Sequence, residues 1–287
     1  MDNSGPSRTA LATAYARAYH QFADRPRILT DPLAARLLGV TAENVDELST
    51  YAADHPAAVA RDRPRRLFFA ARSRFADDAV TAAVARGVRQ IVVLGAGLDT
   101  IAYRNTHPDV HVFEIDHPQT QSWKRERLAT NGIDIPPTAT LVPVDFETQA
   151  LASELETTAF TRTEPAVYVW LGVIYYLTSD AARATLEYIA GQAQPVEVVF
   201  DYLQPAVTDE DRTDLRARAE RLARTGEPLV TYVSPAEIHW QLADLGFTAI
   251  EDLTANELLR RYLAGTPALD AAPPRALRAS RIVHARR

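Results

Sequence analysis

The sequence predicts an α/β fold with a mostly parallel β-sheet and helices on both faces. Short β-branched runs alternate with helical stretches from residue 90 onward, which is the pattern of a parallel sheet. The first of these runs leads directly into a Gly95-Ala96-Gly97 turn. The 287 residues are 47% hydrophobic and 24% charged, as in globular proteins, which excludes a chain that is disordered throughout.

Helices are expected before the first strand. Thr9–Asp24 carries apolar and aromatic residues at helical spacing. Thr30-Asp31-Pro32 has the residues of a helix start, and Gly39 would end that helix. Arg65–Arg86 is a long amphipathic stretch followed by a glycine suited to a helix C-terminus.

Five apolar runs in the middle of the chain are typical of buried strands. They are Gln90–Leu94, His111–Ile115, Thr140–Val144, Ala166–Leu171 and Val196–Tyr202. The stretches between them have helical character: Thr100–Arg104, Gln119–Ala129, Gln149–Leu155 and Ser179–Gln192.

The last third of the chain has clear helix punctuation. Asp209–Arg224 is strongly charged and is expected to form a helix that covers the sheet edge. Two capping boxes predict helix starts after it, with glycines closing each helix. These boxes are Ser234–Glu237, closed by Gly246, and Thr254–Glu257, closed by Gly265; Phe247–Ile250 and Arg281–Ala285 are expected strands.

These elements predict one domain over residues 1–287. Within it we expect a helical N-terminal extension (1–88), a ligand-binding core (89–202), a helical lid insertion (203–235) and the C-terminal part of the core (236–287).

Charge and composition exclude several classes of protein. The formal net charge of −6 argues against a nucleic-acid binder. Without cysteine there is no disulfide, no thiolate catalysis and no cysteine-held metal centre. No apolar run approaches the ~20 residues of a membrane helix. The N-terminal residues lack an apolar signal core, so we expect a cytoplasmic protein without membrane attachment.

The glycine turn predicts a nucleoside-binding loop. Asp116 stands 19 residues after Gly97, near the spacing at which an acid binds ribose hydroxyls. The third glycine of the dinucleotide motif is replaced by Thr100, which favours S-adenosylmethionine over a pyrophosphate-containing nicotinamide cofactor. Simpler roles remain open at this stage: Asp99 as a helix cap, Glu114 as half of an ion pair, and Asp116 as a turn residue.

Several segments together resemble the leucine carboxyl methyltransferase-like family, most closely its bacterial branch of S-adenosylmethionine-dependent O-methyltransferases. The matching segments are Arg17-Ala18, Asp31–Ala34, Ala71–Phe75, Val93–Thr100, Phe113–Pro118 with Lys124, Val144–Phe146, Trp170–Val173 with Tyr176-Leu177, Gly246-Phe247 and Arg261-Tyr262.

The resemblance implies a class I methyltransferase fold, Rossmann-like, with a seven-stranded sheet, and a set of donor-binding residues. Gly95, Ala96 and Gly97 would form the donor loop, Asp116 would bind the ribose, and Asp145 with Phe146 would contact the adenine. Arg72 would hold the methionine carboxylate of the donor. Its helix position supports this role, because Phe68, Arg72 and Phe75 share one face and a buried arginine needs an anion.

One position departs from the family pattern. Many members carry a glutamate where this chain has Leu171, so any role of that acid is in doubt here. This departure keeps open a non-catalytic, donor-binding protein of the same fold, and a nicotinamide-dependent oxidoreductase remains the other alternative.

The sequence therefore predicts a methyltransferase that binds S-adenosylmethionine, releases S-adenosylhomocysteine and uses no metal. The acceptor would be an oxygen of a small molecule, a carboxylate or a phenol, as in bacterial secondary metabolism. We expect its pocket where the fourth and fifth strands end. The weak catalytic candidates are Tyr175, Tyr176 and His239, since only a phenol, with a pKa of about 10, would need a base. The sequence predicts no oligomeric state.

Overall fold

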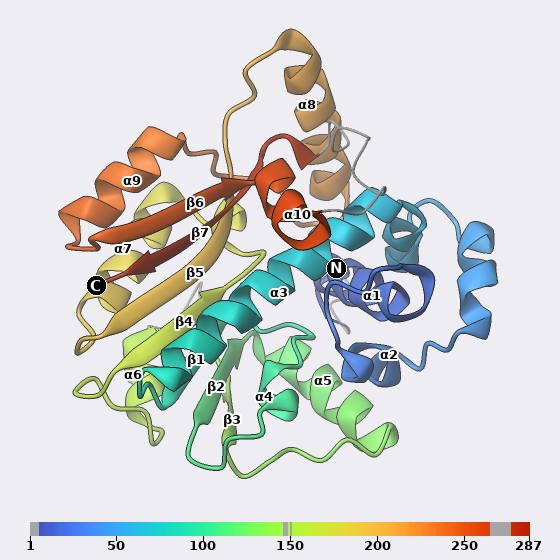
Figure 1. Ribbon diagram of the computed structural model, residues 1–287. Helices are drawn as coiled ribbons and strands as arrows, with labels where there is room; N and C mark the ends of the chain where they lie inside the picture. Colours follow the sequence, from blue (N-terminus) through green and yellow to red (C-terminus); the bar gives the residue numbers. More distant parts are fainter. Residues whose placement is uncertain (1–5, 146–148, 150, 265–276) are drawn as a thin grey trace. The chain divides into compact units, whose positions relative to one another are not determined.

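The computed structural model describes residues 6–145, 149, 151–264 and 277–287. Seven strands form one sheet in the order β3-β2-β1-β4-β5-β7-β6 (Figure 1). The strands are β1 (Gln90–Leu94), β2 (His111–Asp116), β3 (Ala139–Pro143), β4 (Ala166–Trp170), β5 (Val196–Leu203), β6 (Ala249–Thr254) and β7 (Ser280–Arg286). β7 is antiparallel to both of its neighbours, and the β1–β4, β2–β3 and β4–β5 pairs are parallel. The predicted fold class is confirmed.

Helices occur close to where the sequence predicts them. The α-helices are α1 (Arg8–Ala23), α2 (Pro32–Leu38), α3 (Arg63–Ala85), α4 (Ile101–Arg104), α5 (Pro118–Thr130), α6 (Leu151–Glu156), α7 (Ser179–Ala190), α8 (Asp209–Arg224), α9 (Pro235–Asp244) and α10 (Ala255–Leu263). Gly39 takes a left-handed φ of 68° directly after α2, as its predicted role requires. Gly265, the predicted end of α10, lies outside the described residues.

The chain folds into two compact units. The first combines Met1–Asp78 with Gly95–Phe160, and the second combines Ala79–Leu94 with Thr161–Arg287. These boundaries differ from the four predicted stretches of the chain, and the single domain over residues 1–287 stays a prediction.

The first unit is built around α1. Buried residues of α1 and α2, including Tyr19 and Leu37, share a core with Leu98 and Leu128. Two 3-10 segments that the sequence analysis did not predict pack against the same core: η1 (Glu43–Thr50) and η2 (Pro56–Arg61).

A buried ion pair links β2 to α5 inside the first unit. Lys124 Nζ lies 2.7 Å from Glu114 Oε2, and each side chain is 1% exposed. Tyr103 of α4 also donates its hydroxyl to Glu114, over 2.9 Å. Glu114 is therefore half of an ion pair, one of the simpler roles left open by the sequence.

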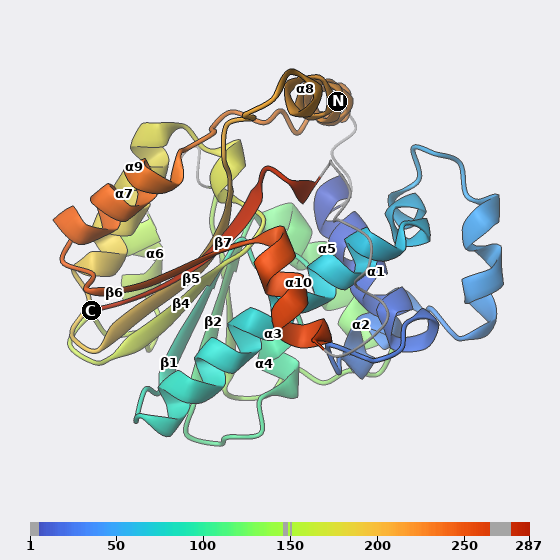
Figure 2. The same cartoon turned by 45° about the horizontal axis from the view of Figure 1, so that its top comes forward.

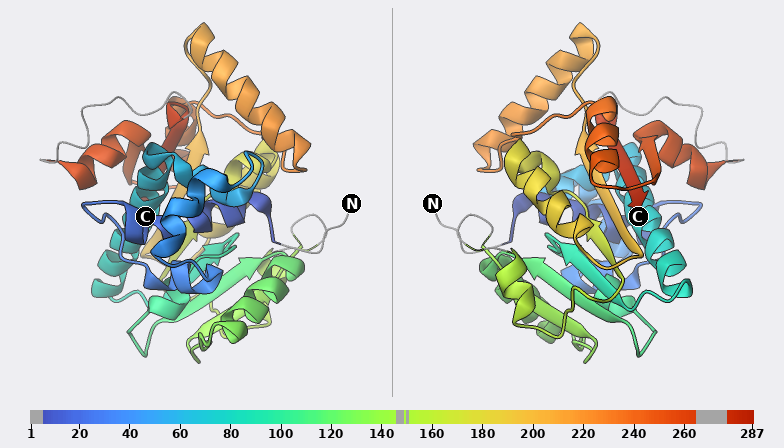
Figure 3. Two further views of the ribbon diagram at one scale, coloured as in Figure 1. Left: turned by 90° about the vertical axis from the view of Figure 1, so that its right-hand side faces the viewer. Right: turned by 90° about the vertical axis from the view of Figure 1, so that its left-hand side faces the viewer.

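The second unit contains β4, β5, β7 and β6. Figure 2 shows α7 and α10 on opposite faces of these strands. Both views of Figure 3 show α8 at the top. Leu215 of this helix packs against the cluster that contains Leu203 of β5. α8 has no buried residue. This is the exposure that its dense charge predicts.

The strand predicted at Phe247–Ile250 is shifted and extends to Thr254. Phe247 instead donates its N–H to the carbonyl of Leu242, which closes α9. The strand then continues through Glu251 and Asp252. Because these residues are charged, hydropathy did not predict this second half of the strand. The side chain of Asp252 is buried, and its charge is tolerated there because Arg281 of β7 donates to its carboxylate over 3.0 Å.

Of the two predicted capping boxes, the one at Thr254 is reciprocal. The Thr254 side chain accepts from the backbone N–H of Glu257, and the Glu257 carboxylate accepts from the backbone N–H of Thr254. At Ser234 the structure shows the first half, a side-chain oxygen that accepts from the N–H of Glu237 over 3.2 Å.

Candidate donor-binding site

The turn after β1 is a loop that only glycine forms without strain. Gly95 and Gly97 have φ values of 63° and 47°, in the left-handed region. Between them, Ala96 donates its N–H to the carbonyl of Ile115 on β2, over 2.9 Å. The loop closes on itself where Asp99 donates its N–H to the Ala96 carbonyl, over 2.7 Å.

Asp116 holds this loop from the end of β2. Its Oδ2 accepts a hydrogen bond from the N–H of Gly97, and its Oδ1 accepts one from the N–H of His117 over 2.7 Å. Burial raises the pKa of the Asp116 carboxyl, and the two backbone N–H groups oppose that rise. Each carboxylate oxygen has a second acceptor site, so the group can also receive a pair of hydroxyls. Asp116 is therefore more than a turn residue.

Asp145 follows β3 beside the end of β2. The register pairs Asp116 with Pro143, and Val144 donates its N–H to the Asp116 carbonyl over 2.9 Å. The backbone N–H of Asp145 is bound to Oε1 of Gln149 at 2.9 Å. Phe146, the second predicted adenine contact, lies outside the described residues.

Arg72 is buried on α3, with 4% of its surface exposed. Its guanidinium carbon lies 5.0 Å from the centre of the Phe69 ring. Phe68 and Phe75, the neighbours on the predicted face, are buried as well. The sequence was therefore correct that Arg72 faces inward, and its contact with the donor carboxylate stays a prediction.

Asp99 acts as the helix cap that the sequence allowed. Its Oδ1 accepts the N–H of Ile101, over 2.7 Å, at the first turn of α4. The sequence analysis did not find the partner of Asp99. Arg17 of α1 lies 3.5 Å from its Oδ2 and also donates to the carbonyl of Leu98, over 2.6 Å.

Two catalytic candidates of the second unit lie together. Tyr175 and Tyr176 belong to the 3-10 segment η3 (Ile174–Tyr176), with their ring centres 4.8 Å apart. They form an apolar cluster with Leu203 and Leu215 and with three further residues. Those three are Leu229, Tyr232 and Ala279.

His239 lies elsewhere. Its Nε2 is 3.0 Å from Oδ2 of Asp252, and the same oxygen accepts the hydroxyl of Tyr202, over 2.8 Å. Tyr202 and Leu203 are consecutive in β5, so their side chains point to opposite faces of the sheet. The tyrosine pair contacts Leu203, so the structure does not join His239 to it.

An acid that sequence reasoning missed stands beside Leu171. Asp201 of β5 is 3% exposed, and its Oδ1 accepts the N–H of Gly172 over 2.5 Å. Asp201 thus places a carboxylate next to the position where many family members carry glutamate. Its occurrence within a fully buried strand was the available signal, because a buried acid requires donors.

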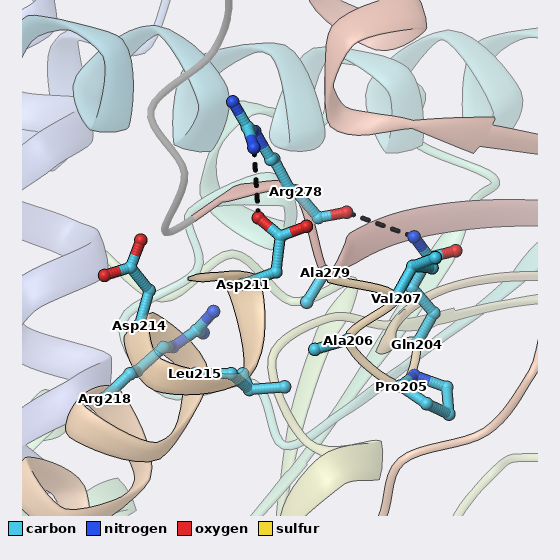
Figure 4. Close-up of a pocket in the computed structure, with 10 residues that line it drawn as sticks. All are labelled: Gln204, Pro205, Ala206, Val207, Asp211, Asp214, Leu215, Arg218, Arg278 and Ala279. Atoms are coloured by element: carbon cyan, nitrogen blue, oxygen red, sulfur yellow. Dashed lines mark hydrogen bonds and ion pairs between the residues drawn. The ribbon is translucent and has the colours of Figure 1, made fainter. Parts of the chain in front are cut away.

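A pocket opens between α8 and the end of β5 (Figure 4). Arg278 closes one side, donating to Asp211 Oδ1 over 3.1 Å, and its carbonyl accepts from Gln204 over 3.2 Å. From α8, the pocket is lined by Asp214, Leu215 and Arg218.

The fold and the loop together define a class of protein. Two solved structures share the fold over nearly the whole chain. One is described as "a putative methyltransferase from Thermobifida fusca". It aligns with a TM-score of 0.58 at 18% identity, and the alignment covers 100% of this chain and 96% of that chain. A DUF574 family protein from Streptomyces avermitilis has a TM-score of 0.54 at 17% identity, with 95% and 96% covered. The sheet order is that of class I methyltransferases.

The sequence comparisons identify the family. The family described as "Leucine carboxyl methyltransferase" matches residues 10–190, and the chain belongs to it. A Bacillus subtilis protein named "Putative S-adenosyl-L-methionine-dependent methyltransferase YktD" is 27% identical over 281 residues, 90% of this chain and 91% of that protein. A Mycobacterium bovis protein named "Putative S-adenosyl-L-methionine-dependent methyltransferase" is 30% identical over 292 residues, with 93% and 92% covered. The predicted family and the prediction of a methyltransferase are confirmed.

Proposed function

We propose that the protein transfers a methyl group from S-adenosylmethionine to an oxygen atom of a small-molecule acceptor, a carboxylate or a phenol. The observation that carries the proposal is the partly buried carboxylate of Asp116, which accepts the N–H of Gly97 at the end of β2. That arrangement presents a hydroxyl-binding acid beside a loop that a nucleoside can approach closely. Membership in the methyltransferase family favours this donor over a nicotinamide cofactor.

The residues of the first unit fit the donor. Asp116 would bind the ribose, Asp145 would contact the adenine, and Arg72 would hold the methionine carboxylate. The donor supplies an electrophilic methyl group on a sulfonium. The task left to the protein is to align donor and acceptor and to exclude water, which is worth ~7–11 kcal/mol in favourable cases.

The pocket under α8 is the candidate acceptor site. It lies at the end of β5, where ligands bind in parallel sheets, and it adjoins the cluster that contains Tyr175 and Tyr176. A carboxylate acceptor, with a pKa of about 4, is ionised at neutral pH and needs no base. A phenol would need one. The cluster that contains the tyrosine pair shares Leu215 and Ala279 with the lining of this pocket, whereas His239 is not among the lining residues. We expect the acceptor to belong to bacterial secondary metabolism.

Calorimetric titration with four ligands tests the donor. S-adenosylmethionine and S-adenosylhomocysteine are expected to bind, whereas NAD and NADP are not. Binding of NAD without a response to the methyl donor would refute the proposal. Transfer of labelled methyl to a panel of aliphatic carboxylates and phenols then separates an enzyme from a non-catalytic binding protein.

Two arginines of α3 provide a matched pair of variants. Arg72→Lys keeps the charge but loses the bidentate geometry, and should weaken donor binding. Arg74 pairs with Asp78 on the exposed side of the helix, over 2.7 Å, so Arg74→Ala should leave the affinity nearly unchanged. Equal losses in the two variants would remove Arg72 from the site.

The described residues contain no group of three or more side chains that could hold a metal ion, and the absence of a metal from the reaction stays a prediction. None of the described helices is long and apolar enough to span a bilayer.

A further inference from the structure

The N-terminal helix lies against the glycine loop at two places. A Cβ atom on Gly97 would stand 3.2 Å from the Cβ of Ala10, so the first turn of α1 passes directly over that glycine. Seven residues later, Nη2 of Arg17 donates to the carbonyl of Leu98, over 2.6 Å. Seven residues make about two helical turns, so both contacts come from one face of α1.

Arg17 is a buried cation whose contacts are made through its two Nη groups. Besides the Leu98 carbonyl, it lies 3.5 Å from Oδ2 of Asp99 and 3.7 Å from Oδ2 of Asp31. Its Nε is buried and has no hydrogen-bond partner in the described part of the chain. Because a buried charge is costly without anions, these carboxylates and the loop carbonyl fix where the guanidinium can lie.

The protonation state of Asp99 depends on its contact with Arg17. Burial alone would raise the pKa of its carboxyl, but the charges of Arg17 and Arg104 lower it overall. An ionised Asp99 is the form that accepts strongly from the N–H of Ile101 and so begins α4. Arg17 therefore supports the loop in two ways. It donates to the Leu98 carbonyl, and it favours the ionised form of Asp99, which caps α4.

Asp31 completes the connection from the side of α2. Its Oδ1 accepts the N–H of Ala34, which caps α2, and its Oδ2 accepts the hydroxyl of Thr100, over 2.8 Å. Asp31 is completely buried. The loop residues 98–100 are thus held by α1 and α2, elements that precede the sheet in sequence by more than fifty residues.

We propose that Arg17 is a positioning residue for donor binding: it fixes the Leu98 carbonyl and Asp99 so that the loop keeps the conformation that receives S-adenosylmethionine. The inference rests on the proposed function. It makes the N-terminal helix part of the binding machinery, although none of its residues needs to touch the donor.

The test compares Arg17 with a second buried arginine of the same unit. Arg66 donates to both carboxylate oxygens of Asp24, at 3.0 Å each, and holds the N-terminal helices without touching the loop. The affinity for S-adenosylhomocysteine is measured by calorimetry, and the midpoint of thermal unfolding by scanning fluorimetry. Arg17→Met should weaken binding by about tenfold or more, the loss expected for a hydrogen bond from a charged group. Arg17→Lys should recover part of it.

Arg66→Met is expected to lower the unfolding temperature while the affinity stays within about twofold of the wild type. Equal affinity losses in Arg17→Met and Arg66→Met, or unchanged affinity in Arg17→Met, would overturn the inference. If Arg17→Met does not fold, Arg17→Lys takes its place, because it keeps the charge but loses the pair of guanidinium donors and should still bind more weakly than the wild type; wild-type affinity in Arg17→Lys would then overturn the inference. Failure of the wild type itself to bind would instead refute the proposed function.

Discussion

Replacing Lys124, the only lysine of the chain, should show how much its buried pair with Glu114 contributes to stability. Lys124 and Glu114 are each 1% exposed and 2.7 Å apart. Lys124→Met keeps most of the volume of the side chain but leaves Glu114 without its cation. The remaining partner is the hydroxyl of Tyr103, at 2.9 Å.

The expected cost is large because the surviving charge stays buried. Breaking a buried ion pair by removing one partner typically costs about 3–5 kcal/mol, out of a total stability of about 5–15 kcal/mol for a domain. Burial already raises the pKa of the Glu114 carboxyl, and the charge of Lys124 opposes that rise. In Lys124→Met the pKa of Glu114 in the folded state should therefore rise further above its value in the unfolded chain.

The sign of the pH dependence follows from that shift. A carboxyl whose pKa is raised by folding binds more protons in the folded state than in the unfolded state. The penalty is therefore absent below the unfolded pKa of about 4 and grows as the pH rises through the folded pKa. Compared with the wild type, Lys124→Met should lose least stability in acid and most above neutrality.

Urea denaturation at several pH values measures this difference. The double variant Lys124→Met with Glu114→Gln is the control, because it has no charge to bury and should lose less stability at pH 8 than Lys124→Met alone. A loss below about 1 kcal/mol in Lys124→Met, or a loss independent of pH, would refute the reasoning that the pair is buried and mutually compensating.

Three further outcomes are expected. Asp116→Ala should weaken S-adenosylhomocysteine binding by about 1.5–3 kcal/mol in calorimetry, and normal binding would remove Asp116 from the site. Gly97→Ala should destabilise the protein in thermal unfolding by about 1–2 kcal/mol, since φ is 47° and the new Cβ meets Ala10; Ala10→Gly should restore part of the loss, and no rescue would contradict the contact. Burial would raise the pKa of Asp24, but hydrogen bonds, led by that from His20, lower it, so its contribution is present above the unfolded pKa and lost as the pH falls through the folded one. The Asp24→Asn variant should therefore have a lower free energy of unfolding than the wild type at neutral pH. Its free energy of unfolding should also change less as the pH falls into the acid range.

Local patterns in the sequence predicted the sheet because its central strands are buried on both faces. Such strands appear as unbroken apolar runs, and β1 was predicted with its observed bounds. Of the strand β6 only the first two residues were predicted, because its charged second half is stabilised by basic residues of other elements. Arg261 of α10 pairs with Glu251, and Arg281 pairs with Asp252.

Some residues of the candidate site were likewise predictable from the local sequence, and others were not. The glycines and Asp116 follow from spacing along one segment of the chain, and the structure shows Gly97 hydrogen-bonded to Asp116. The support for the loop was not predictable in this way. Arg17 and Leu98 are separated by 81 residues. The periodicity of α1 does not distinguish an arginine that donates to a loop carbonyl from one that pairs with a surface acid.

Burial offers a rule that would have found these residues. An ionisable side chain within an apolar stretch costs free energy unless donors or counter-charges meet it, so its position in the sequence predicts a partner even when it cannot name one. Asp201 in β5 and Arg17 in α1 both satisfy that condition, being 3% exposed, and both hold a backbone group at a strand end. Each contacts a main-chain group and not only a side chain, so substitution would move the backbone of the turn. In these two turns, buried charges therefore connect packing between distant segments to the conformation of the backbone.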